Sequence, residues 1–315
     1  MKCPVCLTTD HVYFMSTYDD RYAYPGLFEL RKCVACGHRF LINDFTPDFL
    51  EKLYTDYYPR STFDLDHHQP SPAVKGFKSW LNGERSSVYC WVLKKNARIL
   101  DIGCGFGEAL AYHKSRGCDV YGVEADENIR RVADKFGYNV QVGLFDPEIY
   151  DADFFDYVTM NQVIEHMIEP LDTMRGIARV LKPGGLAILS TPNADGLAAK
   201  FFGRRWINWH VPYHTQLFTR KSMRLAAEQA GLSLERVRTI TSSEWLHYQW
   251  LHLLTFPAPC TPSSFWSPYA KPDIKAWFII KILSQVHRTK VNHFITRILD
   301  ALGVGDNILF FLRKT

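Results

Sequence analysis

The sequence lacks the long apolar runs and the charge excess that are typical of membrane-spanning and nucleic-acid-binding proteins. No stretch reaches the roughly 18 consecutive apolar residues that a membrane-spanning helix needs. The first ten residues, MKCPVCLTTD, lack the apolar core of a secretory signal, so we expect a cytoplasmic protein. A net charge of only +4 over 315 residues does not by itself indicate a nucleic-acid partner. Internal repeats and low-complexity tracts are also missing.

What is present describes an ordinary globular chain. Hydrophobic residues make up 47% and charged residues 22%, which is enough apolar material for a sizeable core. The length suits one large domain plus a smaller module. In a cytoplasmic protein, the eight cysteines are expected to be reduced thiols or metal ligands.

Two C-x-x-C pairs lie near the N-terminus, and they consist of Cys3, Cys6, Cys33 and Cys36. This spacing lets the four thiolates bind one tetrahedral zinc ion. We interpret residues 1–45 as a zinc ribbon whose metal is structural, with a hairpin between the pairs, followed by a helix and linker over 46–75. A redox role is disfavoured because no thioredoxin-like strand and helix frame either pair. A nucleic-acid-binding ribbon stays open, because basic residues flank the second pair.

A glycine loop follows the first strongly apolar stretch after the linker. ARILDIG is typical of a strand buried on both faces, and Gly103, Gly105 and Gly107 follow it. A helical pattern comes next, and then a second apolar stretch that ends at Glu124. The order strand, glycine loop, helix, strand, acid predicts a doubly wound parallel sheet with a ligand at the carboxyl ends of its strands.

The loop favours a ligand without phosphates. A dinucleotide site has the spacing G-x-G-x-x-G, whereas this loop has G-x-G-x-G followed directly by Glu108. A carboxylate in the first helical turn would repel a phosphate, and no Gly-Lys-Ser/Thr follows. A ligand with an amino acid, a positive sulfur and a ribose fits, with Glu124 accepting two hydrogen bonds from the ribose hydroxyls.

These residues resemble the class I S-adenosylmethionine (SAM) methyltransferases. The resemblance rests on five stretches in order: ILDIGCGFGEAL, YGVEADENI, FDYVTMNQVIEHMIEP, RVLKPGGLAILSTPN and GDNILFFLRK. It implies an α/β fold with a doubly wound seven-stranded sheet, whose SAM-binding domain would span residues 76–242. A helical lid insertion would occupy residues 243–303, and the final strand would occupy 304–315.

The resemblance also implies a set of cofactor-binding residues: Asp101, Gly103, Gly105, Gly107, Glu124, Ala125, Leu144, Phe145, Asn161 and Gln162. Asp101 and Gly103 would face the methionine part of SAM, and residues 143–146 would lie along the adenine. Asn161 and Gln162 would reach the methionine or the sulfonium side.

Methyl transfer from a sulfonium needs positioning, and it needs a base if the acceptor is a hydroxyl. Histidine titrates near neutral pH, so we rank His214 first and His166 second as the base. Quinone O-methyltransferases that resemble this chain have an acid three residues before Glu165-His166 that helps bind magnesium. The chain has Gln162 there, so we predict no metal at this site.

Nucleic-acid acceptors are disfavoured by motif as well as by charge. Amino-methylating nucleic-acid enzymes carry Asn/Asp-Pro-Pro-Tyr/Phe after the fourth strand, where this chain has MNQV. The Pro-Cys of base-carbon methylation occurs only at Pro259-Cys260, far downstream.

The insertion before the last strand has apolar residues at helical spacing from Ile274 onward, and its basic residues outnumber its acids. Long loops of this kind are usually functional. The first interpretation is a helical cap over the substrate, buried against the sheet. The second is a peripheral membrane contact through 274–300 that admits a lipid-linked acceptor.

The combination of zinc module, LYTDYY and an aromatic insertion resembles methyltransferases that modify sugars or polyketide-type metabolites. In the sugar C-methyltransferases, the zinc module and its tyrosines help form the acceptor site, which implies Tyr57, Tyr58, His210 and Tyr213 as substrate residues. We predict methyl transfer to oxygen or carbon of a small-molecule or glycan acceptor in a biosynthetic pathway. The alternatives are a quinone-type or lipid-linked O-methyltransferase, a SAM-fold scaffold without catalysis, and a zinc-ribbon nucleic-acid binder.

Overall fold

Seven strands form the central sheet of the computed structural model, which describes residues 1–58, 65 and 68–315. The strands lie in the order β10-β11-β8-β7-β4-β5-β6. Their bounds are β4 (Arg98–Ile102), β5 (Asp119–Glu124), β6 (Asn139–Val142), β7 (Phe155–Asn161), β8 (Leu181–Pro192), β10 (Leu232–Thr239) and β11 (Asn307–Lys314). Neighbouring strands are parallel except at β11, which is antiparallel to both β8 and β10. The predicted seven-stranded fold class is confirmed.

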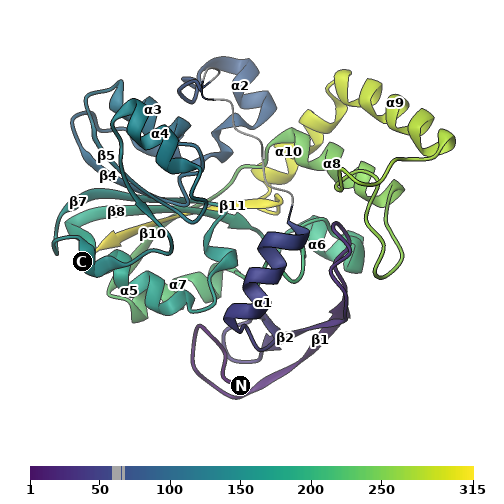
Figure 1. The fold of residues 1–315 in the computed structure, drawn as a ribbon, viewed down its shortest axis with the longest axis horizontal. Coiled ribbons are helices and arrows are strands. Elements are labelled where there is room, and N and C mark those ends of the chain that lie inside the picture. The colour runs from purple at the N-terminus through teal and green to yellow at the C-terminus, as the bar shows by residue number, and fades with distance from the viewer. Residues whose placement is uncertain (59–64, 66–67) are drawn as a thin grey trace.

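Helices cover both faces of this sheet (Figure 1). One face carries α3 (Glu108–Lys114) and α4 (Ile129–Phe136), and the other carries α5 (Pro170–Val180) and α7 (Arg220–Gln229). Because both faces are covered, the central strands are almost wholly apolar and buried, as in residues 99–102 of β4. The chain leaves β4 toward β5 and β6 and then returns to β7 on the other side of β4. This reversal opens a crevice at the carboxyl ends of β4 and β7, where ligands of such sheets bind.

A second, four-stranded sheet joins the N-terminal module to the rest of the chain. Its order is β1 (His11–Thr17), β2 (Phe28–Cys33), β3 (Arg39–Ile42) and β9 (Gln216–Leu217). The predicted hairpin between the cysteine pairs is present as β1 and β2. The fourth strand, however, comes from the segment after β8, so the module shares its sheet with the part of the chain that forms the larger sheet.

The segment between the module and β4 is partly helical. α1 (Pro47–Lys52) begins at the Thr46 side chain, which accepts a hydrogen bond from the Phe49 amide, and a π-helical turn (Leu53–Tyr57) follows. The predicted linker lies partly outside the described residues, and α2 (Gly76–Asn82) follows it. The short helix α6 (Leu197–Phe202) comes after β8.

The insertion before β11 contains three helices, α8 (Ser243–Leu254), α9 (Ile274–Arg288) and α10 (Val291–Ala301). α8 and α10 pack against each other, and α10 also contacts α2 and β10. α9 has no buried residue and projects from the molecule (Figure 1), so the expected burial against the sheet is wrong for this helix. Within the described part of the chain, no helix is long and apolar enough to cross a membrane.

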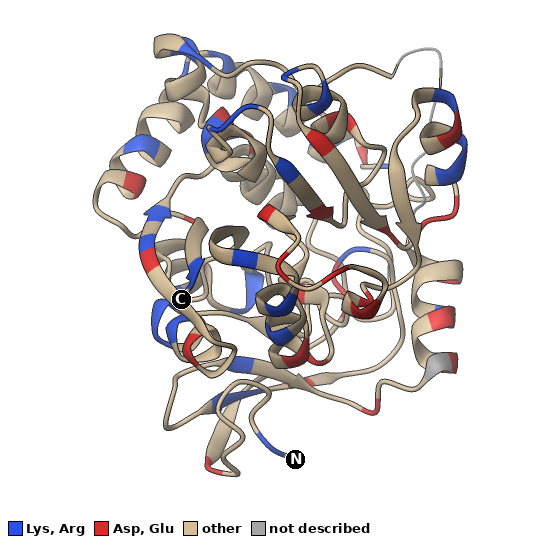
Figure 2. Cartoon of the chain, turned by 90° about the vertical axis from the view of Figure 1, so that its left-hand side faces the viewer, with Lys and Arg blue, Asp and Glu red and all other residues tan. Residues whose placement is uncertain are grey.

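Charges of both signs are interspersed over the face drawn in Figure 2. This distribution agrees with the small net charge of +4.

Candidate active site and metal centre

The loop after β4 needs glycine for its backbone shape. Gly103, Gly105 and Gly107 have φ angles of 74°, 55° and 81°, in the left-handed region that other residues rarely adopt. A Cβ atom on Gly103 would lie 2.4 Å from the Val163 side chain, which follows β7. A Cβ on Gly105 would meet nothing within 4 Å, so this part of the loop is open to a ligand.

Glu124, the last residue of β5, is fixed at the mouth of this loop. One carboxylate oxygen accepts a hydrogen bond from the Gly105 amide at 2.9 Å, and the other accepts one from the Asp126 amide at 3.0 Å. The side chain is half-buried. Each carboxylate oxygen has a second lone pair, so Glu124 can still accept hydrogen bonds from two hydroxyls.

Asp101 lies buried beside the loop and accepts a hydrogen bond from the Thr159 hydroxyl at 2.6 Å. Burial raises the pKa of Asp101 to about 7, because the ionised form is poorly solvated there. A cation placed against this carboxyl would favour its ionised form, so the position suits a positively charged ligand group.

The remaining predicted cofactor residues follow the same set of strands. Asn161 ends β7, Ala125 follows β5 at the surface, and Leu144 and Phe145 follow β6. Since β7, β4, β5 and β6 are adjacent and parallel, the structure brings all ten predicted residues to one edge of the sheet. Their roles in binding stay predictions.

A cavity of about 350 Å³ opens at the end of β7. Its wall includes Asn161, Gln162, Tyr89, Asn208 and Trp245. Gln162 has a left-handed backbone with φ 58°, an uncommon conformation for a residue other than glycine. Such strain persists only where the surroundings hold it, which is typical of functional sites.

The two candidate bases, His166 and His214, lie side by side with ring centroids 4.8 Å apart. The Nδ1 atom of His166 lies 2.9 Å from the Tyr213 carbonyl oxygen, and that of His214 lies 2.9 Å from the Asn208 carbonyl oxygen. Each Nδ1 therefore carries the ring proton and donates a hydrogen bond to the carbonyl oxygen. In the neutral ring, this leaves each Nε2 as a hydrogen-bond acceptor.

Burial keeps these imidazoles neutral. It lowers the pKa of His166 to about 4 and lowers the pKa of His214 well below its ordinary value. From the sequence, we expect a histidine base with its ordinary pKa near neutral pH. In the folded protein, the basic form of both rings is instead already present at pH 7.

Glu165 completes this cluster and was not among the predicted site residues. It is fully buried, and burial raises its pKa to about 8. Ligand atoms of Glu165, His166 and His214 lie within 4.8 Å of one another, close enough to share a metal ion. The predicted absence of a metal at this site therefore stays a prediction.

Aromatic rings from the N-terminal part of the chain close over His210. Tyr58 lies 5.2 Å from Tyr213 between ring centroids, and His210 lies 4.8 Å from Tyr213. The structure thus groups three of the four predicted substrate residues. Tyr57 is separate from them, because its ring packs on Tyr24 at 4.9 Å.

Sequence reasoning missed two members of this aromatic group. Tyr54 and Tyr22 have ring centroids 5.7 Å and 5.6 Å from that of Tyr213. Tyr54 precedes Tyr58 by about one helical turn, so helical spacing within LYTDYY was a usable signal. Tyr22 lies in the loop between β1 and β2, and nothing local in the sequence marks it.

Several buried polar atoms in this region have no hydrogen-bond partner among the described residues. They are Glu165 Oε2, His210 Nε2 and the Tyr213 hydroxyl. Buried polar groups are nearly always paired, and unpaired ones that cluster in one place indicate a ligand or water position.

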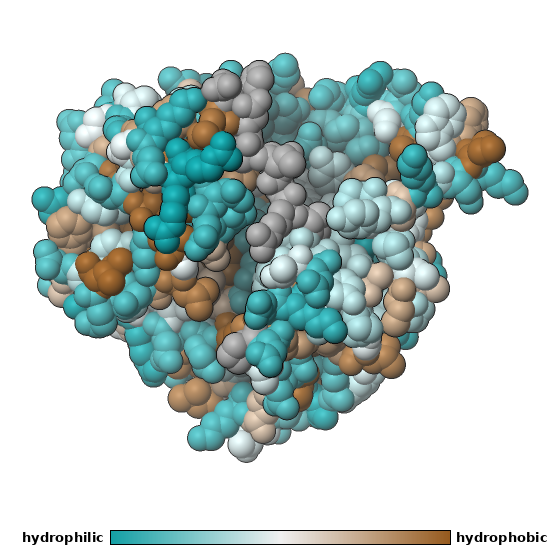
Figure 3. Space-filling model, in the orientation of Figure 1, coloured by the Kyte–Doolittle hydropathy of each residue, from teal (hydrophilic) through white to brown (hydrophobic). Residues whose placement is uncertain are grey.

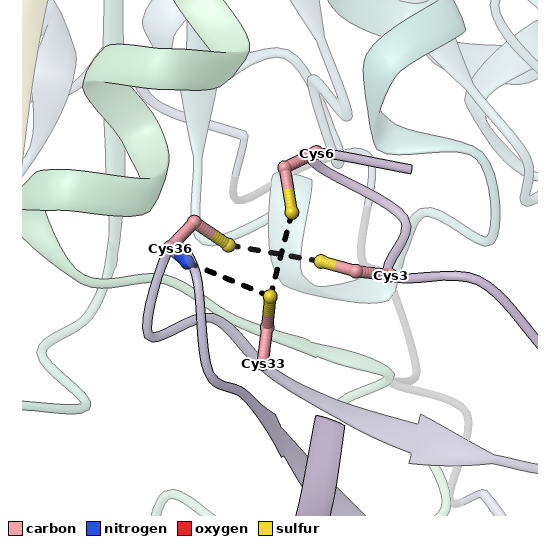
Figure 4. A group of neighbouring side chains, drawn as sticks. All are labelled: Cys3, Cys6, Cys33 and Cys36. Carbon is pink, nitrogen blue, oxygen red and sulfur yellow. Dashed lines mark hydrogen bonds between the residues drawn. The ribbon is translucent and has the colours of Figure 1, made fainter. Parts of the chain in front are cut away.

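The four N-terminal cysteines point toward one another (Figure 4). Sγ of Cys3 lies 3.7 Å from that of Cys36, and Sγ of Cys6 lies 3.4 Å from that of Cys33. A disulfide would require about 2.05 Å, so all four are free thiols. Tetrahedral zinc with Zn–S bonds of about 2.3 Å places its sulfurs about 3.8 Å apart, so these residues fit a zinc ion.

Comparison with known proteins agrees with this geometry. A family model described as a methyltransferase domain matches residues 85–237. A ubiquinone biosynthesis O-methyltransferase of Thiobacillus denitrificans is 31% identical over 157 residues, which cover 46% of this chain and 68% of the relative. One of Maricaulis maris is 34% identical over 150 residues, which cover 44% of this chain and 59% of the relative. The chain thus spans about three fifths of the length of that curated relative.

A solved structure of a SAM dependent methyltransferase from Archaeoglobus fulgidus is also similar. It is 17% identical, with 85% of this chain and all of that chain covered and a TM-score of 0.47.

The doubly wound seven-stranded sheet and its glycine loop define a class I methyltransferase fold. The matches to the family model and to the relatives show that the chain belongs to the SAM-dependent methyltransferases. The cofactor of that family is S-adenosylmethionine.

Proposed function

We propose that this protein transfers a methyl group from SAM to an oxygen or carbon atom of a small-molecule or glycan acceptor in a biosynthetic pathway. The observation that carries the proposal is the set of unpaired buried atoms of Glu165, His210 and Tyr213 beside two neutral histidines. A hydroxyl of the acceptor would provide the missing hydrogen-bond partners, and a neutral imidazole Nε2 would take its proton.

In this proposal the strand ends hold the cofactor. Asp101 faces the methionine amino group, Glu124 accepts from the ribose hydroxyls, and Leu144 and Phe145 flank the adenine. When bound, SAM supplies a methyl group on a positively charged sulfur. The protein then has to align the acceptor with that methyl group, exclude water and remove a proton.

Calorimetric titration with SAM tests the cofactor assignment. Glu124→Ala removes the carboxylate at the loop and should weaken binding at least tenfold, which corresponds to about 1.4 kcal/mol. Glu127→Ala is the matched control, because Glu127 is an exposed acid three residues further along the chain, in the loop between β5 and α4. If the wild type shows no measurable heat, the cofactor assignment is overturned.

His214 is proposed as the base because its Nδ1 proton is held by the Asn208 carbonyl and its Nε2 is an acceptor. His214→Ala should keep SAM affinity and lower turnover by about 10² to 10⁴. His247→Ala is a matched control, a buried histidine on α8 outside the cluster. If His214→Ala keeps full turnover and His166→Ala loses it, His166 is the base instead.

A second candidate is a quinone-type or lipid-linked O-methyltransferase. It is favoured by two relatives that are 31–34% identical to this chain, both of them ubiquinone biosynthesis O-methyltransferases. Radiolabelled SAM offered with nucleotide-linked sugars in one set and catechol-type quinols in another separates the two. Label in the sugars supports the first candidate, and label in the quinols supports the second.

A structural zinc ion held by Cys3, Cys6, Cys33 and Cys36 is also proposed. It is supported by sulfur-to-sulfur distances of 3.4 Å and 3.7 Å between the paired cysteines.

A further inference from the structure

Helix α10 is amphipathic in the opposite sense to a helix packed on an apolar core. Its buried residues are polar: Asn292, His293, Thr296 and Arg297. They have polar partners inside: Asn292 accepts a hydrogen bond from the Trp250 indole at 3.3 Å, and Arg297 pairs with Asp300 at 2.8 Å. Among their buried side-chain atoms, only His293 Nδ1 and Arg297 Nε have no partner among the described residues. Its exposed residues are apolar: Val291, Phe294, Ile295 and Ile298, with Leu302 directly after the helix.

Helix α9 likewise turns apolar side chains to solvent. Ile274, Phe278, Ile282 and Val286 are all exposed and recur every fourth residue, so they form one stripe along the helix. Figure 3 shows hydrophobic side chains on the projecting part of the molecule where Figure 1 places α9. Clusters of large exposed apolar side chains in one region usually mark an interaction surface.

Basic residues accompany these apolar side chains. Lys271, Lys275, Lys281 and Arg288 are exposed. Asp273 is the one exposed acid between Lys271 and Leu302, and it caps α9 through the Ala276 amide at 2.7 Å. The other acid of this segment, Asp300, is paired with Arg297. The outward surface of α9 and α10 therefore combines apolar side chains with a positive charge.

We propose that α9 and α10 form a docking surface for an anionic lipid bilayer. Apolar side chains would enter the boundary between headgroups and acyl chains, while the flanking lysines and arginine would contact anionic headgroups. A second copy of this chain fits less well, because it would place two positive surfaces against each other. The proposal goes beyond the methyltransferase reaction and does not depend on it.

Co-sedimentation of the 315-residue protein with vesicles tests the proposal. We expect binding to vesicles of phosphatidylcholine with phosphatidylglycerol, weak binding to phosphatidylcholine alone, and weaker binding as salt rises. Phe278→Ser/Ile298→Ser removes apolar contacts, and Lys275→Glu/Lys281→Glu reverses charge. Each double variant should weaken binding to the anionic vesicles about tenfold or more.

Phe201→Ser is the matched control, since Phe201 is a 75% exposed phenylalanine on α6, and it should bind like the wild type. Unchanged thermal unfolding and SAM affinity in both double variants show that fold and cofactor site are intact. Equal binding by wild type and both double variants, or no binding by the wild type, overturns the proposal. So does a dimer in light scattering that Phe278→Ser/Ile298→Ser converts to a monomer, because the surface then belongs to a second copy.

Discussion

At the scale of single residues, burial sets the protonation states around the candidate site. It raises the pKa of Asp101 to about 7 and that of Glu165 to about 8, and it lowers the pKa of His166 to about 4. Near neutral pH the histidines are therefore neutral bases, Glu165 is mostly protonated, and Asp101 is divided between its two forms. The residue type alone indicated His166 and His214 as candidate bases. Their burial and the contact between their rings depend on tertiary packing.

The shifted pKa of Asp101 predicts that SAM binding depends on pH. A positively charged cofactor favours the carboxylate, so protonation of Asp101 competes with binding below its pKa of about 7. We expect roughly eightfold tighter binding at pH 7.5 than at pH 6, measured by calorimetry in buffers of different ionisation enthalpy. Asp101→Asn should bind more weakly and show a flat profile. If SAM affinity still depends on pH in Asp101→Asn, the proton that competes with binding belongs to another group.

The same shift affects stability in the opposite direction. The folded cofactor-free protein holds a proton on Asp101 more tightly than the unfolded chain does. This contribution to stability is complete below the unfolded pKa of about 4 and is lost as pH rises through about 7.

At the scale of elements, local pattern predicted much of the sheet and glycine loop but not which surfaces meet. The strand that ends at Asn161 and the loop at Gly103 follow from apolar runs and turn residues. The periodicity of α9 was also visible, but periodicity does not say whether a stripe faces a core or solvent. Tyr57 and Tyr58 are adjacent, yet only Tyr58 joins the aromatic group. Tyr57 ends the π-helical turn, whereas Tyr58 follows it with an extended backbone.

The N-terminal cysteine cluster predicts that the stability of the N-terminal module depends on a bound metal ion. Metal analysis of the purified protein should find one zinc ion per chain, and its removal by a chelator should lower the free energy of unfolding by several kcal/mol. The reason is that Cys3, Cys33 and Cys36 lie in the same buried cluster as Phe40 and Phe218. Cys3→Ser/Cys36→Ser should abolish zinc binding, whereas Cys260→Ser, at an exposed cysteine, should not. A zinc-free wild type with an unchanged unfolding midpoint would contradict a structural metal.

At the scale of the whole molecule, the N-terminal module is built into the methyltransferase part of the chain. β9 completes its sheet, and the His38 ring lies 2.8 Å from the Gln216 side-chain oxygen. Farther along, the Gln229 side-chain amide donates a hydrogen bond to the Val5 carbonyl oxygen at 2.8 Å. The buried core around Phe218 and the cysteines extends across this junction. The aromatic group over His210 also draws on both parts: Tyr22 comes from the module, Tyr58 from the segment that follows it, and Tyr213 from the methyltransferase part.

This integration predicts that the methyltransferase part does not fold stably without the module. Deleting residues 2–45 removes three of the four strands of the smaller sheet and exposes Phe218 and Met223, which are fully buried in the intact chain. Burying a large apolar side chain stabilises a fold by about 1.5–3 kcal/mol, and whole domains are stable by only about 5–15 kcal/mol. The deleted protein should therefore lose its cooperative thermal transition and its SAM affinity together. Gln229→Ala removes one hydrogen bond across the same junction and should cost only about 1 kcal/mol. A soluble deletion variant that unfolds cooperatively and binds SAM like the wild type would show that the two parts are separate units, and that the zinc module only adds to a site that is already complete.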